Sequence, residues 1–490
     1  MKSQIFNPYL PGNEYIPDGE PHVFGDRLYI FGSHDAFNGP AYCVNDYVCW
    51  SAPVNDLSDW RFEGVIYRKE QDRLNPNGTR FMFAPDVAQG SDGRYYLYYT
   101  LDLTDDVGAM SVAVCDTPAG KYEYYGAIRY TNGDIVGLKD GELLNFDPGI
   151  FIDDDRRIFL YTGMVPPNIV PLQKKIDALN RIADGGYVIE LEPDMLTLKA
   201  GPKRLLGGIE ETKDSDFEGH AFFEASSMRK INGKYYFIYS SENSHELCYA
   251  IGDKPDGDFH YGGTIVSIGD VFLNGRLREN ALNYLGNTHG SIECLNGKCY
   301  VFYHRQTNLH QFSRQACAEE IKIMNDGSIP QVEITSCGLN GGPLAGRGIY
   351  EARIACNLYS KDGVFAYGMV KPANTDHPYF TQETPDCEEN ASQYIANMKD
   401  GSTAGFKYFD MDGADRISIV IRSNDNGLII VSLDKANGAP IAQIPIGPNS
   451  KWYKVETSLL PAFSKRALYF TYQGNGNIDF KSFELYKRGQ

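Results

Sequence analysis

The stretch from Glu224 to Ser241, EASSMRKINGKYYFIYSS, contains the pattern that decides the fold. An Asn-Gly turn at 232–233 separates two short segments, and the second is rich in aromatic residues, which is typical of a β-hairpin. The same pattern occurs four more times along the chain. The other copies are EPHVFGDRLYIFGSHD from Glu20, DVAQGSDGRYYLYYT from Asp86, DPGIFIDDDRRIFLYTG from Asp147 and HGSIECLNGKCYVFYHRQ from His289.

The five hairpins recur at intervals of about 60 to 80 residues, and helical periodicity is almost absent between them. Repeats of this length, each with room for about four strands, are typical of a β-propeller, in which every blade packs on its neighbours. The pattern therefore predicts an all-β protein in which residues 1–335 form a five-bladed β-propeller.

An ionisable residue stands at a nearly constant distance before each hairpin turn: Asp18, Asp86, Asp147, Glu224 and His289. If the first strand of each hairpin lines the central channel, these side chains surround one mouth of it. Acidic residues also favour strand starts and turns, so one copy alone would carry little weight. Five together indicate a functional site, because clustered carboxylates raise one another's pKa at a cost in stability.

Three acids at one channel mouth suit the hydrolysis of a glycosidic bond. That reaction needs a proton for the leaving oxygen and a base or nucleophile on the opposite face of the sugar. A third acid can set the pKa and orientation of the proton donor. We expect Asp18 and Glu224 to face each other across the channel, a gap that leaves room for water and predicts inversion of configuration.

The segments PDGEPHVFGDRLYIFGSHD, FDPGIFIDDD, FFEASSMRKINGKYY and NTHGSIECLNGKCYVFYHRQ together resemble glycoside hydrolase family 43. The resemblance covers roughly residues 5 to 335 and implies a five-bladed propeller that hydrolyses with inversion. It implies Asp18 as the general base, Asp147 as the pKa modulator and Glu224 as the general acid. The chain departs from the family pattern at Asp18-Gly19, Glu224-Ala225 and Phe83-Ala84-Pro85-Asp86, where Asp-Pro, Glu-Gly and Trp-Ala-Pro-Asp are usual.

The resemblance also implies residues around the sugar. Arg305 would reach the sugar in the first subsite, Phe83 would stack beside it, and Asp86 would lie in the same pocket wall. His289 would help to hold a calcium ion on the propeller axis through water; the alternative is a histidine satisfied by neighbouring backbone groups.

Two further acidic features have alternative interpretations. Glu218, in DFEGH, also precedes a glycine and is a rival for the general acid, although its offset from the Asn-Gly turn does not match the other copies. The run Asp153, Asp154 and Asp155 resembles a metal cluster but falls on a hairpin turn, where we expect it to be solvated.

A Gly-rich connection at 336–345 leads to residues 346–490, where short strands such as RISIVIRS and LIIVSLD predict an antiparallel β-sandwich. This part resembles a family 6 carbohydrate-binding module. The resemblance implies a sugar cleft with Tyr408, Trp452 and Asn477, and a structural calcium ion in the sandwich. A module that only buttresses the propeller is the alternative.

Composition and charge limit the classes of ligand and the cellular locations that we expect. The formal charge of -18 argues against nucleic acid or an anionic membrane as a partner, and no apolar run is long enough to span a bilayer. The ten cysteines contain no C-x-x-C pair, and the start of the chain has no signal-peptide pattern. We therefore expect reduced thiols and a cytoplasmic location.

The combined expectation is an inverting exo-glycosidase without a cofactor in its chemistry. It would release α-L-arabinofuranosyl or β-D-xylosyl residues from arabinoxylan-derived oligosaccharides. An endo-arabinanase, a galactan-cleaving hydrolase and a non-catalytic sugar-binding propeller are the alternatives. A protein-interaction scaffold would need exposed docking patches, which the sequence does not indicate.

Overall fold

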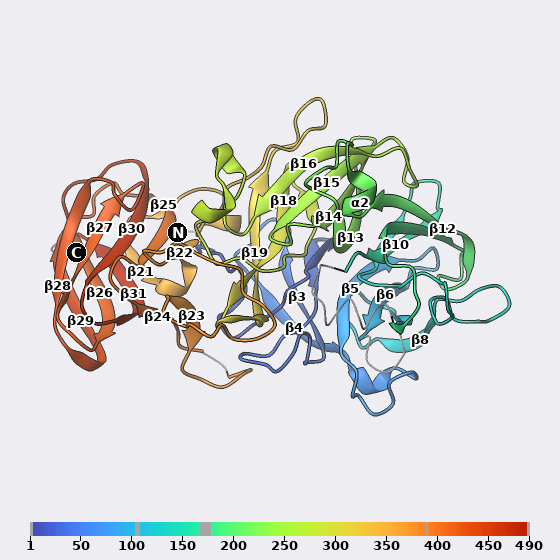
Figure 1. Ribbon diagram of the computed structural model, residues 1–490, viewed down its shortest axis with the longest axis horizontal. Helices are drawn as coiled ribbons and strands as arrows, with labels where there is room; N and C mark the ends of the chain where they lie inside the picture. The colour runs from blue at the N-terminus through green and yellow to red at the C-terminus, as the bar shows by residue number, and fades with distance from the viewer. Residues whose placement is uncertain (1–2, 103–107, 167–177, 389–390, 488–490) are drawn as a thin grey trace.

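The structure is a computed structural model that describes residues 3–102, 108–166, 178–388 and 391–487. Nearly all regular secondary structure in these residues is β-strand, and the described helices, such as α2 (Ile209–Thr212), are single turns (Figure 1). The prediction of an all-β protein is thus confirmed. No helix among the described residues is long and apolar enough to cross a membrane.

Five antiparallel sheets follow one another along the first two thirds of the chain, and in each the strands are hydrogen-bonded in sequence order. Four sheets have four strands and the fifth has three. Blade I contains β1 (Glu20–Phe24), β2 (Arg27–Phe31), β3 (Tyr47–Pro53) and β4 (Arg61–Tyr67). Blade II contains β5 (Met82–Gln89), β6 (Tyr95–Leu101), β7 (Met110–Cys115) and β8 (Glu123–Ala127).

The remaining blades have the same order. Blade III contains β9 (Gly149–Ile152), β10 (Ile158–Met164), β11 (Gly185–Leu191) and β12 (Leu198–Gly207). Blade IV contains β13 (Phe222–Ile231), β14 (Lys234–Ser241), β15 (Glu246–Gly252) and β16 (His260–Ser267). Blade V contains β17 (Ile292–Leu295), β18 (Lys298–Thr307) and β19 (His310–Ile321).

The first strand of each blade faces the axis, and the five sheets close into a ring. β1 contacts β5, β5 contacts β9, β9 contacts β13, and β17 contacts β1. Ser227 of blade IV and Ser291 beside β17 share a hydrogen bond of 2.8 Å, and Gly19 pairs with Gly290 in a parallel bridge. This is the arrangement of a five-bladed β-propeller.

The middle strands explain why the sequence repeats aromatic residues. In β6, Tyr96 and Tyr98 belong to the core between blades II and III, whereas Leu97 and Tyr99 belong to the core between blades I and II. Successive residues of a strand point to opposite faces. Because both faces of a middle strand are buried against neighbouring blades, apolar and aromatic residues occupy successive positions there.

Two six-stranded sheets follow the propeller and share one apolar core. The first sheet contains β20 (Leu344–Ala345), β25 (Thr403–Asp410), β30 (Lys465–Gly474), β27 (Gly427–Leu433) and β28 (Pro440–Ile446), with β22 (Asn357–Tyr359) paired to β25. The second contains β23 (Tyr379–Gln382), β24 (Gln393–Met398), β31 (Ile478–Tyr486), β26 (Arg416–Ser423) and β29 (Asn449–Ser458), with β21 (Gly348–Glu351) paired to β31.

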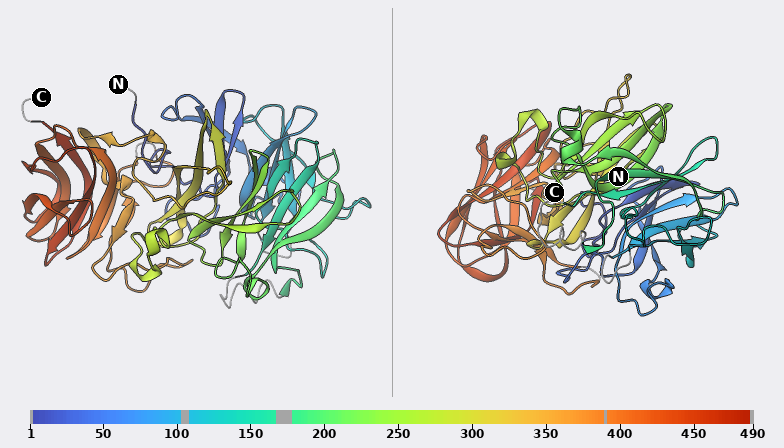
Figure 2. Two further views of the ribbon diagram at one scale, coloured as in Figure 1. Left: turned by 90° about the horizontal axis from the view of Figure 1, so that it is seen from above. Right: turned by 45° about the vertical axis from the view of Figure 1, so that its right-hand side comes forward.

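The C-terminal sheets lie beside the propeller along the long axis of the molecule (Figures 1 and 2). The predicted connection at 336–345 needs a small correction, because Leu344 and Ala345 already form β20 and pair with β25. The junction is buried and charged. Lys407 of β25 is 2% exposed and binds Asp270 (3.2 Å) and Glu333 (2.9 Å) of the propeller part.

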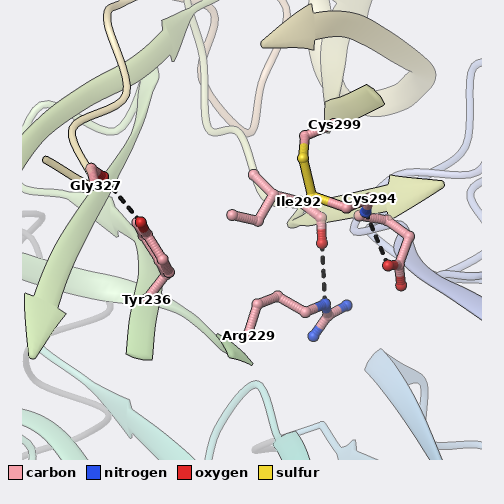
Figure 3. Close-up of a disulfide and its surroundings, with 7 residues drawn as sticks. Arg229, Tyr236, Ile292, Cys294, Cys299 and Gly327 are labelled. Carbon is pink, nitrogen blue, oxygen red and sulfur yellow. Dashed lines mark hydrogen bonds between the residues drawn. A yellow bond between two sulfur atoms is a disulfide. The ribbon is translucent and has the colours of Figure 1, made fainter. Parts of the chain in front are cut away.

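A disulfide joins Cys294 and Cys299 across the hairpin of blade V (Figure 3). The two residues lie directly opposite each other in the β17–β18 register, as a two-residue turn at Asn296-Gly297 requires, so the sequence already contained the signal for this pairing. The hairpin also packs on blade IV, where Arg229 Nε donates to the carbonyl of Ile292 (3.0 Å). The expectation of ten reduced cysteines is therefore wrong for this pair. The cytoplasmic location is untested by these contacts and stays a prediction.

Candidate active site

The three predicted carboxylates lie at the starts of innermost strands, at positions where the backbone turns sharply. Asp18 and Asp147 each stand two residues before a strand and have positive φ angles of 57° and 47°. Glu224 lies in β13 beside a register shift, and Ala225 next to it has a φ of 69°. Positive φ is uncommon for residues other than glycine, and such positions cluster at functional sites.

Asp18 is surrounded by cationic and imidazole groups. Arg314 Nη1 donates to its Oδ1 (3.0 Å), and its backbone N–H donates to His304 Nδ1 (3.2 Å). Burial alone would raise the pKa of Asp18, but Arg314, His304 and His289 outweigh burial and hold the pKa below its ordinary value. Asp18 is therefore ionised at neutral pH, as a base must be.

Glu224 has the opposite electrostatic environment. It is 8% exposed, and within the described residues no protein group donates a hydrogen bond to its carboxyl. Burial and the negative charge of Asp18 raise the pKa of Glu224 to about 8, although Arg314 partly opposes them. A carboxyl group with this pKa carries a proton at neutral pH and can donate it.

Asp147 resembles Glu224 in its electrostatic environment. Its Oδ2 accepts a hydrogen bond from the backbone N–H of Ala225 (3.1 Å) and lies 3.5 Å from His289 Nδ1. Burial, Glu224 and Asp18 together raise its pKa well above the ordinary value. Asp147 thus contacts the peptide next to Glu224 and couples to its titration.

Arg314 is the functional residue that the sequence analysis missed. Its side chain is 3% exposed, and its guanidinium binds both oxygens of Asp35 (2.9 and 3.0 Å) as well as Asp18. Arg314 lies on β19, a buried strand in which a charged side chain needs a partner. The strand sequence HQFSRQACAEEI is mostly polar, so no local pattern singled out Arg314, and its burial is visible only in the structure.

Arg305 does not lie at the carboxylates, and its predicted role is corrected. Its guanidinium donates to the carbonyls of Ala355 (2.8 Å) and Arg353 (2.6 Å) and stacks 3.9 Å from the ring of Phe380. Its neighbour His304 faces Asp18 instead. Adjacent residues of a strand point to opposite faces of the sheet. His304 therefore points to the active site, whereas Arg305, one residue later, points to the interface with the C-terminal part.

Asp86 lies deeper in the channel than predicted, so its placement in the pocket wall is corrected. It is fully buried, and His22 Nε2 (2.6 Å) and the backbone N–H of Ile150 (2.7 Å) bind its two oxygens. Asp86 lies three residues before the end of β5 at Gln89, whereas Asp18 lies six before the end of β1 at Phe24. The prediction counted residues back from the hairpin turn. The loop between β5 and β6 is longer than that between β1 and β2, so the same count reaches a deeper position on β5.

The remaining propeller residues have simpler outcomes. Phe83 is half-buried and packs 5.8 Å from Phe146, which directly precedes Asp147, and its contact with a sugar stays a prediction. Glu218 is exposed and accepts a hydrogen bond from the backbone of Asp214, which removes it as a rival acid. Of the acidic run, Asp154 and Asp155 are exposed, whereas Asp153 is buried and paired with Lys230 at 2.7 Å.

His289 lies on the axis between two layers of acids. Its Nδ1 is 3.5 Å from Asp147 and 3.9 Å from Asp18, and its Nε2 is 3.9 Å from Glu20 Oε1. Burial lowers the pKa of His289 to about 4, so the ring is neutral. Glu20 Oε1 is buried and has no hydrogen-bond partner within the described residues. Burial and the neighbouring Asp86 raise the pKa of Glu20 to about 8, so this carboxyl would give up a proton on binding a cation. Carboxylate oxygen and neutral imidazole are both ligand types that a hydrated cation accepts.

The predicted sugar cleft of the C-terminal part is corrected for Tyr408. Tyr408 lies on the first sheet, where its hydroxyl donates to Glu333 (2.5 Å) at the propeller junction. Trp452 belongs to the second sheet, and Asn477 directly precedes its strand β31. Trp452 stacks against Arg422 (4.5 Å), which with Asn477 lines a surface hollow of about 490 Å³.

An ionised base, a protonated acid and a third carboxylate at one channel mouth define the class of protein: a glycoside hydrolase. The family model described as glycosyl hydrolases family 43 matches residues 7–329. The chain belongs to this family.

Several known proteins are similar over long stretches. A xylosidase/arabinosidase of Thermoclostridium stercorarium is 49% identical over 487 residues, which covers 99% of both chains. A xylosidase/arabinosidase of Bacteroides ovatus is 30% identical and covers 60% of this chain and 87% of its own. Among solved structures, CoXyl43, a family 43 β-xylosidase/α-arabinofuranosidase from a compost microbial metagenome, is 26% identical with a TM-score of 0.51. It covers 68% of this chain and 98% of that one, and was solved with xylotriose in a calcium-free form.

Proposed function

We propose that this glycoside hydrolase is an inverting, exo-acting enzyme that releases β-D-xylosyl and α-L-arabinofuranosyl residues from arabinoxylan-derived oligosaccharides. The observation that carries the mechanism is the opposite shift of two pKa values: that of Asp18 is lowered and that of Glu224 is raised to about 8. The whole-length similarity to a xylosidase/arabinosidase supports the sugar specificity. Xylopyranose and arabinofuranose present similar hydroxyl groups, so one pocket can accept both.

In this mechanism each acid has one task. Asp18 accepts a proton from water as the water oxygen bonds to the anomeric carbon. Glu224 gives its proton to the leaving oxygen as the glycosidic bond breaks, and Asp147 maintains the raised pKa and the orientation of Glu224. Asp18 and Glu224 belong to blades I and IV, which are not neighbours in the ring, and this separation supports a water molecule between base and sugar.

The hydrolysis itself requires only protein side chains and water, but we propose calcium as a structural ion in the channel. Glu20 and His289 would hold it through water, and its positive charge would favour the ionised form of nearby carboxyl groups. A group of Glu20, His22 and Asp86 lies within reach of one ion. A calcium ion in the C-terminal sheets, also predicted from resemblance, stays a prediction. Both ions would be tested by the unfolding temperature with calcium and with a chelator.

We further propose that the C-terminal sheets form a β-sandwich module with a weak sugar contact at Trp452 and Asn477. The hollow near these residues is lined by aromatic, amide and charged groups, including Tyr394 and Arg422. Aromatic faces and planar polar groups are the usual means of holding a neutral sugar.

The deciding experiment is release of p-nitrophenol from the β-D-xyloside and the α-L-arabinofuranoside by the wild type, Asp18→Asn and Glu224→Gln. We expect wild-type activity on at least one substrate and almost none in Asp18→Asn. Because p-nitrophenol leaves without much protonation, Glu224→Gln should keep more activity on the aryl glycoside than on xylobiose.

A wild type that is inert on both aryl glycosides and on arabinoxylan oligosaccharides would contradict the proposal. Activity on arabinan or galactan polymers would then support the endo-acting or galactan-cleaving alternative.

A further inference from the structure

One segment of the C-terminal part reaches back to the propeller beside the catalytic carboxylates. Residues 364–386, here called the bracing segment, include β23 and connect to β22. Ala366 pairs with Leu285 in a parallel bridge, the Gln311 backbone N–H donates to the Gly368 carbonyl (3.2 Å), and that of Asn308 donates to Phe380 (2.9 Å). The bracing segment therefore docks on blade V by main-chain bonds, which hold its position closely.

The first link from the bracing segment to the active site passes through Gln311. Its Nε2 donates to the carbonyl of Tyr367, and its Oε1 accepts a hydrogen bond from the hydroxyl of Tyr42 (2.5 Å). The ring of Tyr42 lies over the guanidinium of Arg314 at 4.7 Å, and Phe312 packs edge-on against the same ring. Fixing the hydroxyl of Tyr42 thus fixes the ring that covers Arg314.

The second link is Asp386. Its Oδ1 accepts a hydrogen bond from the backbone N–H of Phe37 (2.5 Å), and its Oδ2 accepts one from Asn45 Nδ2 (3.2 Å). Phe37 and Asn45 flank the loop that carries Tyr42 and Cys43. One carboxylate therefore ties both ends of this loop together.

The loop in turn surrounds Arg314. The backbone N–H of Cys43 donates to Asp35 Oδ1 (2.9 Å), and Asp35 binds the guanidinium through both oxygens. A guanidinium makes its hydrogen bonds in a rigid planar fork, so the position of Asp35 and Tyr42 determines where the remaining Nη1 points. Nη1 points at Asp18.

We infer that the bracing segment is a functional part of the active site: through Gln311 and Asp386 it positions Arg314 against the general base Asp18. Gln311 and Asp386 are positioning residues, since neither touches the reacting atoms. The inference rests on the proposed role of Asp18. It gives the C-terminal part a role in catalysis that does not depend on sugar binding by that part.

The test compares Asp386→Ala and Gln311→Leu with the control Asp376→Ala in the full-length chain. Asp376 lies in the same segment but pairs with Lys399, which directly follows β24 in the C-terminal part. We expect Asp386→Ala and Gln311→Leu to lower kcat/KM for the aryl glycoside about tenfold or more, and the control to retain wild-type values. Asp386→Asn, which keeps an acceptor oxygen for Phe37, should restore part of the loss.

The pH profile of kcat/KM distinguishes a displaced Arg314 from a general loss of folded structure. Arg314 helps to hold the pKa of Asp18 low, so a displaced Arg314 should move the acidic limb of kcat/KM to higher pH. The variants replace none of the other titratable groups that face Asp18 and Arg314, although they are expected to displace Tyr42 and the loop beside Asp35. These groups are Asp35, Tyr42, Cys43, Tyr47, Asp147, Glu224, His289 and His304.

Hydrogen exchange gives a readout that needs no activity. Amides of residues 36–46 should exchange faster in Asp386→Ala than in Asp376→Ala. Unchanged exchange in this loop, or a kcat/KM equal to that of the control, would overturn the inference. A wild type inactive on all glycosides would instead overturn the proposed function, and the exchange data would still decide whether the segment braces the loop.

Discussion

Two layers of acidic side chains lie in the channel, and they differ in what surrounds them. In the outer layer, Asp18 is held ionised by Arg314 and Glu224 is held protonated by burial. In the deeper layer, Asp86 accepts hydrogen bonds from His22 and from the backbone N–H groups of Val87 and Ile150. Acidic residues at different depths on the innermost strands thus have different roles: those of the outer layer take part in the chemistry, and Asp86 of the deeper layer stabilises the structure. Glu224 and Asp86 show the difference most clearly, because no protein group within the described residues donates a hydrogen bond to the Glu224 carboxyl, whereas three donate to Asp86.

The largest effect is expected from a substitution of a catalytic acid in the outer layer. Asp18→Asn removes the base while keeping the shape of the side chain. We expect kcat to fall by about 10²–10⁴-fold, the usual contribution of a general base. The measurement is hydrolysis of xylobiose and of the aryl xyloside. A loss of less than tenfold on both would show that another group activates water.

The pH dependence is the next largest effect. The acid must be protonated and the pKa of Glu224 is raised to about 8, so activity should persist to about pH 8 and then fall about tenfold per unit. The base must be ionised and the pKa of Asp18 is lowered, so activity should persist to below the ordinary range for aspartate. Asp147 titrates with Glu224, so the upper midpoint belongs to the pair. A basic limb near pH 5 would contradict the assignment.

A substitution in the deeper layer should lower the stability of the protein and leave the rate of hydrolysis almost unchanged. Asp86→Asn replaces one acceptor oxygen by an NH₂ group facing His22 or the N–H of Ile150. An unsatisfied buried donor costs about 1–3 kcal/mol, so the unfolding temperature should fall while kcat of the folded enzyme stays within about threefold of wild type. Calorimetry and single-point kinetics measure both. Unchanged stability with a raised KM would place Asp86 in contact with the sugar.

The smallest effect is expected far from the channel. Trp452→Ala alters the second C-terminal sheet, and kcat/KM on the aryl glycoside should stay within about twofold, as for a surface substitution. Retention on insoluble arabinoxylan in a pull-down should decrease if the proposed sugar contact exists. Equal retention of wild type and variant would leave the C-terminal part with only its bracing role.

Most of the fold follows from local pattern. The hairpin copies and their spacing predicted five repeats, and ring closure confirms them. The offset from the hairpin turn selected the three carboxylates together with Asp86 and His289, and the family resemblance assigned catalytic roles to the three. The prediction that Arg305 contacts the sugar was wrong by one position. His304 and Arg305 are neighbours in the sequence, yet only His304 faces Asp18.

By itself, then, the sequence determined the β-propeller and the acids at its mouth, because strand periodicity and turn residues are local properties. The family resemblance implied which acid is the base and which is the proton donor, but only the tertiary structure gives the physical cause of the ionised state of Asp18 and the protonated state of Glu224. Those states depend on Arg314, His304 and the bracing segment, which come from distant parts of the chain. Strand face and long-range charge arise from packing, and no short stretch of sequence contains them.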